Sequence, residues 1–168
     1  GAVTATNGVG IFARNSGTDL TVTTGASPVT GTRGIYARNL GTGALSITAN
    51  GDVTGGAAAG IDAQNNFGAG TDLTITTGAG TTVAGGLFGV RAFNYGSGAL
   101  AIAVNGDVTG TVTGITALNY NGTSLTVTTA AGTTISGGSM GLSAINYGSG
   151  GLTITVNGDV IGGTDDGI

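Results

Sequence analysis

The chain has 168 residues, of which 37 are glycine and only 7% are charged, and its formal net charge is −4. It contains no cysteine, histidine, tryptophan, lysine or glutamate. These absences exclude disulfides, Cys/His metal sites and an imidazole or lysine general base, and the acidic charge argues against nucleic acid as a partner.

A pattern of Gly, aliphatic, any residue, Ala, any residue, Asn recurs along the chain. The six copies are residues 10–15, 34–39, 60–65, 89–94, 114–119 and 141–146, and a seventh begins at Gly167. They start 24, 26, 29, 25, 27 and 26 residues apart, a spacing typical of solenoids. Because the aliphatic residue and the alanine share one face of an extended chain, each copy predicts a short strand.

Each of these anchors is followed by two further segments. The first alternates apolar and small polar residues, as in Leu20-Thr21-Val22-Thr23-Thr24, and predicts a half-buried strand. Its other copies begin at Leu45, Leu73, Leu100, Leu125 and Leu152. The second is shorter and centres on Val3, Val29, Val53, Val83, Val108, Ile135 or Val160. Gly, Asn and Asp between the segments predict turns.

Three short strands per repeat predict an all-β fold, a right-handed single-stranded parallel β-helix (β-solenoid). We expect about 6.5 coils of ~26 residues, stacked at about 4.8 Å, with residues 1–168 as a single β-helix fragment of a longer repeat array. Inward aliphatic residues then form columns. One column is Ile11, Ile35, Ile61, Val90, Ile115 and Leu142. A single coil buries too little apolar surface to fold alone, so stability must come from contacts between coils.

Two polar patterns accompany the aliphatic columns. The asparagines that close the anchors, Asn15 to Asn146, predict a ladder of side-chain hydrogen bonds that supports the turns; the alternative is a polar binding stripe. Asn-Gly-Asp-Val occurs at 50–53, 105–108 and 157–160, in every second coil. Duplication of a two-coil unit explains this alternation, which also keeps the aspartates apart.

The sequence offers no catalytic arrangement. Acid pairs that cleave glycosides lie about 5–9.5 Å apart with one raised pKa, whereas the aspartates here are spread over alternate coils. Residues 137–141 match the GxSxG pattern of hydrolases, but without histidine there is no triad. We expect no enzymatic activity, no catalytic residue, no cofactor and no metal site.

Outward threonines predict two rows on the second strands. A flat Thr-x-Thr array on a β-helix resembles the ice-binding face of hyperactive antifreeze proteins, and glycan binding is a further use of such rows. Threonine is also a favourable outward strand residue, so a plain strand surface is the alternative. The candidate ice- or ligand-binding residues are Thr21, Thr23, Thr74, Thr76, Thr126, Thr128, Thr153 and Thr155.

Large side chains predict a second surface near the ends of the anchors. Leu40, Phe67 and three tyrosines follow the closing asparagines, and the outward column turns apolar in the later coils. Such a patch is typical of a contact surface; the alternative is a stack covered by its own loops. Asp62 and Arg91 in adjacent coils are expected to pair. The candidate contact residues are Tyr95, Tyr120, Tyr147, Phe93, Leu118 and Ile145.

Over its whole length, the alternation of Gly-Ile-x-Ala-x-Asn with Leu-Thr-Ile-Thr-x-Asn-Gly-Asp-Val resembles the passenger β-helix repeats of autotransporter proteins of Gram-negative bacteria. The resemblance implies a secreted, non-catalytic structural or adhesive rod at the extracellular, outer-membrane surface, with a host or neighbouring cell as partner. No apolar run is long enough to span a membrane, so we expect no direct insertion. Because the chain starts and stops inside a repeat, we expect uncapped strand edges and head-to-tail self-association.

Overall fold

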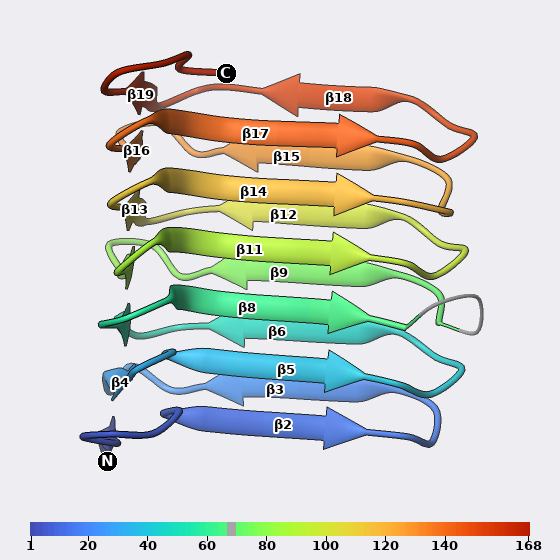
Figure 1. Cartoon of the computed structure of the whole chain (residues 1–168), viewed down its shortest axis with the longest axis horizontal. Coiled ribbons are helices and arrows are strands. Elements are labelled where there is room, and N and C mark those ends of the chain that lie inside the picture. The colour runs from blue at the N-terminus through green and yellow to red at the C-terminus, as the bar shows by residue number, and fades with distance from the viewer. Residues whose placement is uncertain (67–69) are drawn as a thin grey trace.

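The chain winds through three parallel sheets that run the length of the molecule (Figure 1). The computed structural model describes residues 1–66 and 70–168, and among them it has 19 strands and no helix. Every strand pairs with the equivalent strand of the next coil in parallel register. The predicted all-β parallel solenoid is therefore confirmed, with two sheets of six strands and one of seven.

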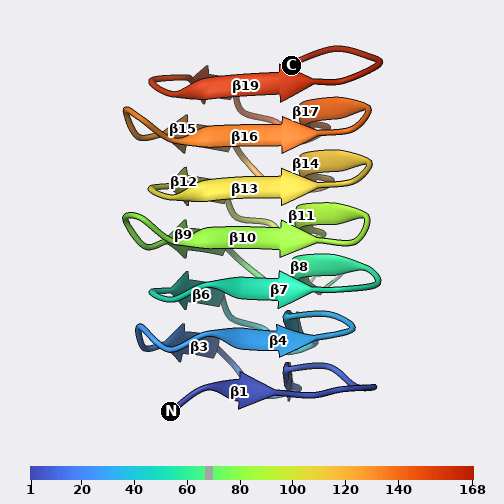
Figure 2. The same cartoon turned by 90° about the vertical axis from the view of Figure 1, so that its left-hand side faces the viewer.

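The three sheets correspond to the three sequence segments. Sheet B holds the anchors, in the strands β2 (Ile11–Asn15), β5 (Ile35–Asn39), β8 (Ala59–Asn65), β11 (Phe88–Asn94), β14 (Thr113–Asn119) and β17 (Met140–Asn146). Sheet C holds the alternating segments, β3 (Leu20–Thr24), β6 (Leu45–Ala49), β9 (Leu73–Thr77), β12 (Leu100–Val104), β15 (Leu125–Thr129) and β18 (Leu152–Thr155). Sheet A, which faces the viewer in Figure 2, holds β1 (Val3–Thr4), β4 (Val29–Gly31), β7 (Val53–Gly55), β10 (Thr82–Gly85), β13 (Asp107–Gly110), β16 (Thr134–Gly137) and β19 (Asp159–Gly162).

The core consists of the predicted aliphatic columns. In sheet B, Ile35 pairs with Ile61 and Ile61 with Val90, and all three side chains are fully buried. Sheet C shows the same arrangement at its leucine column, where Leu45, Leu73, Leu100 and Leu125 are fully buried. Burial alternates along β5, β6, β9, β12 and β15, as the period-two pattern predicts. One aliphatic interior thus connects all the coils.

The glycine that opens each anchor makes room for the core of sheet A. A Cβ atom on Gly89 would lie 2.5 Å from Val108 Cγ1, and one on Gly60 would lie 2.7 Å from Val83 Cγ1. These distances are far below van der Waals contact, so a larger residue would displace the aliphatic side chain of the facing strand in sheet A. The anchor glycines are therefore required by packing between sheets B and A.

From the third coil on, the anchor strands are longer than predicted. β8, β11, β14 and β17 each have seven residues and start before the anchor glycine, whereas β2 and β5 have five. The additional residues pair as well, with Phe88 lying between Ala59 and Thr113 in neighbouring coils. Residues before the glycine do not alternate in hydropathy, so the sequence gives no signal for this extension.

The closing asparagines form the predicted ladder in two runs, from Asn15 to Asn39 and from Asn94 to Asn146. Asn94 Nδ2 donates to Asn119 Oδ1 at 3.1 Å, and Asn119 Nδ2 donates to Asn146 Oδ1 at 2.9 Å. Each side chain also holds its own turn, as where Gly96 N donates to Asn94 Oδ1. Asn94 and Asn119 are fully buried. This burial supports the turn-stabilising interpretation over that of an exposed binding stripe.

The aspartates at the turns also bind the neighbouring coil. Asp52 Oδ1 accepts from Thr82 N, and Asp107 Oδ1 accepts from Thr134 N, each at 2.8 Å. At another corner, Asp72 Oδ1 accepts from Ala99 N at 2.7 Å. These carboxylates accept hydrogen bonds from backbone N–H groups at or just before the start of a strand. They therefore serve as caps between coils, a role that is structural and that charge spacing alone did not suggest.

Candidate functional site

The outward face of sheet C carries the predicted threonine rows. Thr126 pairs with Ala101 on one side and Thr153 on the other, and Thr128 pairs likewise with Ala103 and Thr155. The rows are therefore in register, with Ser46 and the two alanines as the only departures. All eight predicted threonines are half-buried or exposed. In the described part of the chain, none of their hydroxyls makes a hydrogen bond.

The second predicted surface is a ladder of aromatic rings beside the ends of β11, β14 and β17. The rings of Tyr95 and Tyr120 stack at 4.5 Å between centroids, and those of Tyr120 and Tyr147 at 5.7 Å. Phe93 meets Tyr95 and Tyr120 edge to face. Leu118 lies between Phe93 and Ile145 in register. The structure thus brings all six predicted contact residues together; Phe67 lies outside the described residues.

This ladder is most exposed at its last member. Tyr147 retains 62% of its accessible surface and Ile145 retains 40%, whereas Tyr95, Tyr120 and Phe93 are only half-exposed. Burial raises the pKa of Tyr95 above its ordinary value; the charge of Tyr120 and a side-chain hydrogen bond with it raise the pKa further, and Arg91 lowers it. The rings of Tyr95, Tyr120 and Phe93 are therefore partly shielded from solvent, and Tyr147 is the most exposed ring of the ladder.

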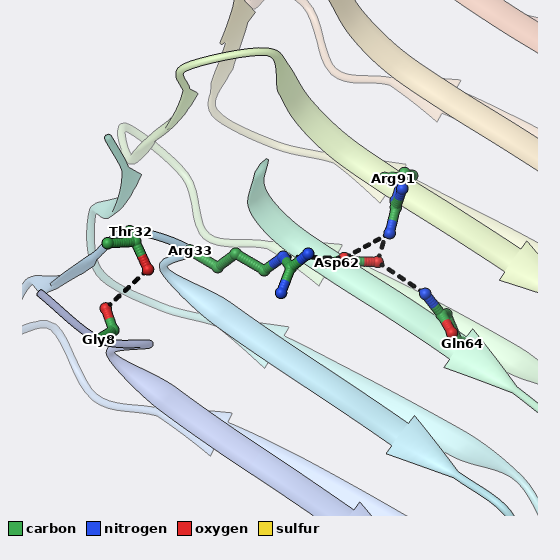
Figure 3. Close-up of polar contacts among 6 residues, drawn as sticks. All are labelled: Gly8, Thr32, Arg33, Asp62, Gln64 and Arg91. Carbon is green, nitrogen blue, oxygen red and sulfur yellow. Dashed lines mark hydrogen bonds and ion pairs between the residues drawn. The ribbon is translucent and has the colours of Figure 1, made fainter. Parts of the chain in front are cut away.

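A buried carboxylate holds two arginines on the face of sheet B (Figure 3). The Arg91 guanidinium donates two hydrogen bonds to the Asp62 carboxylate, from Nε to Oδ1 at 3.1 Å and from Nη2 to Oδ2 at 2.7 Å. Arg33 approaches from the other side, with Nε 3.4 Å from Asp62 Oδ2. Asp62 itself is 1% exposed. The predicted pairing of Asp62 with Arg91 is confirmed, and Arg33 is a third member that the sequence did not indicate.

Aromatic rings support both arginines of this cluster. The guanidinium carbon of Arg33 lies 4.7 Å from the centre of the Tyr36 ring, and that of Arg91 lies 5.2 Å from the Phe93 ring. Such cation–π contacts fix an arginine over the sheet surface. The cluster thus links the early coils to the aromatic ladder.

A hollow of about 160 Å³ opens beside this cluster, where sheet B turns toward sheet C. Among the described residues it is lined by Arg38, Leu40, Gln64, Asn66 and Tyr95, together with the ladder residues Asn39 and Asn65. Arg38 Nε is buried there without a hydrogen-bond partner. The repeat pattern of the sequence does not predict this hollow. Its only signal was the outward column Arg14, Arg38, Gln64, which places two like charges in adjacent coils.

The described residues contain neither a group of three potential metal ligands nor a helix that could cross a bilayer. The adjacent acids Asp165 and Asp166 lie in the turn after β19, where Ser139 Oγ is 3.5 Å from Asp165 Oδ2. No protein-family model matches the chain, and neither the search of curated proteins nor the search of solved structures returns a match.

Proposed function

We propose that the chain is a non-catalytic structural and adhesive rod, a segment of a secreted autotransporter-like passenger at a bacterial cell surface. The observation that supports this is the continuity of the three sheets, which share one aliphatic core through every coil. A uniform core gives a rod of constant cross-section. The outward residues vary from coil to coil, so binding specificity would come from the side chains on the outer faces of the sheets.

The proposal includes right-handed winding with a coil of ~26 residues. Connections between parallel strands of one sheet are right-handed in about 98% of cases, which supports this hand. Solenoids also tolerate insertions at corners while keeping their register. The 29-residue interval between the third and fourth anchors is of this kind, because the strands on both sides of it remain paired.

Antibody labelling tests the location. Antibodies raised against the chain should label intact cells of the organism that produces it, without permeabilisation. An antibody against a cytoplasmic protein of the same cells serves as the control and should label only after permeabilisation. Labelling by both antibodies only in permeabilised cells would overturn the cell-surface proposal.

A bead assay tests adhesion separately. Beads coated with the folded chain should attach to host cells or to cells of the producing bacterium, and free chain should compete. Beads coated with heat-unfolded chain are the control for general stickiness. Attachment equal to that control would contradict the adhesive role while leaving the structural role intact.

Ice binding is the second candidate, and the in-register threonine rows of sheet C favour it. Thermal hysteresis of the purified chain measures it directly. Thr76→Lys, in the middle of the array, should abolish hysteresis. Thr54→Lys, exposed on sheet A, is the matched control and should leave it unchanged. A chain without hysteresis overturns this candidate.

A further inference from the structure

The charges of the chain are segregated onto different faces. All four arginines lie on or directly beside sheet B, at Arg14, Arg33, Arg38 and Arg91, and Asp62 is the only aspartate within that sheet. The other seven aspartates lie in turns or at the start of strands in sheet A. An acidic molecule therefore presents one cationic face. Such a face attracts anions even though the net charge is negative.

Two of the four arginines form no ion pair with a carboxylate in the described part of the chain. Arg33 and Arg91 share Asp62, but neither Arg14 nor Arg38 has an ion pair in the described part of the chain. Arg14 and Arg38 are register partners on adjacent strands, so their charges face outward one coil apart. Like charges directly opposite each other on a sheet destabilise it. An anion placed between them would remove this penalty.

The hollow beside Arg38 has the chemistry of a sugar site. Arg38 Nε is buried without a partner, although a guanidinium can hold a carboxylate with two parallel hydrogen bonds. Gln64 Nε2 donates to Asp62 Oδ1 and Asn66 Nδ2 donates to the Leu40 carbonyl oxygen, so these two side chains offer their amide oxygens to the hollow. Tyr95 supplies the side of an aromatic ring. Amides recognise hydroxyl groups, and aromatic rings pack against the apolar C–H face of a sugar. The volume of about 160 Å³ suits one small group rather than a large ligand.

We propose that sheet B binds an anionic polysaccharide, with one acidic sugar unit seated in this hollow and its anionic group between Arg38 and Arg14. The aromatic ladder continues along the same sheet from Tyr95 to Tyr147, so the polymer follows the ladder away from the hollow. This inference deepens the adhesive part of the proposed function and rests on it for its biological meaning. Binding by the purified chain is nevertheless independent of where the chain is located.

Titration calorimetry with polygalacturonate tests the site. The wild-type chain should bind at about 50 mM salt and more weakly at about 300 mM, because screening reduces the attraction. Arg38→Gln should weaken binding about tenfold to a hundredfold, as expected for a lost charged hydrogen bond. Gln64→Leu should weaken it as well. Dextran sulfate, as the second probe, distinguishes a sulfated from a carboxylated source of the anion.

Arg33→Gln is the matched control, since it removes the same charge from the same face outside the hollow. It should change the affinity less than about threefold. Equal losses in the two arginine variants, or equal binding of neutral dextran, would overturn the proposal, because either result would mean general attraction rather than a site. Thermal unfolding of each variant shows that it is folded. Absence of binding here, with surface labelling and bead attachment intact, would refute this site without refuting the rod.

Discussion

Thr77 and Asn105, in adjacent coils, are joined by two hydrogen bonds, both donated by Asn105. The Thr77 hydroxyl accepts from Asn105 N at 2.9 Å, and Asn105 Nδ2 donates to the Thr77 carbonyl oxygen at 2.9 Å. The same arrangement joins Thr24 to Asn50 and Thr129 to Asn157. A coil that ends sheet C with this threonine is therefore followed by a coil with the asparagine that donates to it. This pairing gives the two-coil alternation a physical basis.

Replacing Thr77 by valine should lower the free energy of unfolding by about 1–3 kcal/mol. The valine keeps the volume, but the backbone donors of Asn105 and Gly106 lose their acceptor at a fully buried position. Urea unfolding measures the loss. The control is Thr76→Val on the outward face of the same strand, which should change stability by less than about 0.5 kcal/mol. Equal losses would contradict the role given to this hydroxyl.

The sequence predicts the columns but not this contact. Alternation of period two shows which residues of β9 point inward, and the 24–29-residue spacing of the anchors places them in register. It does not show that Thr77, the last residue of the strand, faces the turn of the following coil. That relation depends on the corner where sheet C ends, which has no periodic signal.

The hollow beside Arg38 is unpredictable for a related reason. Its lining comes from three different coils, with Arg38 from one, Gln64 from the next and Tyr95 from the one after. Columns identify residues that share a position in the repeat. A site built from different positions in successive coils requires the paths of the turns, and these vary because the intervals between repeats vary.

Replacing Gly89 by alanine should destabilise the chain by about 1–3 kcal/mol, as overpacking does in a filled core. The new methyl group would meet Val108 Cγ1 at 2.5 Å and the Gly114 carbonyl oxygen at 2.7 Å. Gly25→Ala is the control, because a Cβ atom at Gly25 meets nothing within 4 Å. That change should stabilise the chain slightly, by up to about 1 kcal/mol. Thermal unfolding distinguishes the two signs, and a loss in both variants would contradict the packing argument.

Replacing Asp62 by asparagine should cost about 1–3 kcal/mol. The change leaves Arg33 and Arg91 facing each other without the carboxylate that both contact. The cost stays below that of a fully buried ion pair because both arginines reach solvent. Part of the loss should be recovered in high salt, which screens the repulsion between the arginines.

The control for this change is Asp19→Asn. Asp19 is exposed and accepts one backbone hydrogen bond, from Ala44 N at 2.8 Å, with no arginine beside it. Its replacement should cost less than that of Asp62 and should show no recovery in salt. Unfolding curves at two salt concentrations decide the matter, and identical salt dependence in both variants would contradict the arginine cluster.

Tyr95 should titrate above the ordinary range of a tyrosine, because burial and Tyr120 raise its pKa. A phenol whose pKa is higher in the folded chain holds its proton after the unfolded chain has lost it, above about pH 10. The folded state then binds more protons, so stability should fall as the pH rises from that value toward the pKa of folded Tyr95. Tyr120→Leu should lower the pKa of Tyr95. Ultraviolet titration is run on the wild-type chain and on Tyr120→Leu, each with and without Tyr95→Phe, and the difference within each pair gives the titration of Tyr95. The same Tyr95 pKa in both pairs would contradict the coupling of these two rings.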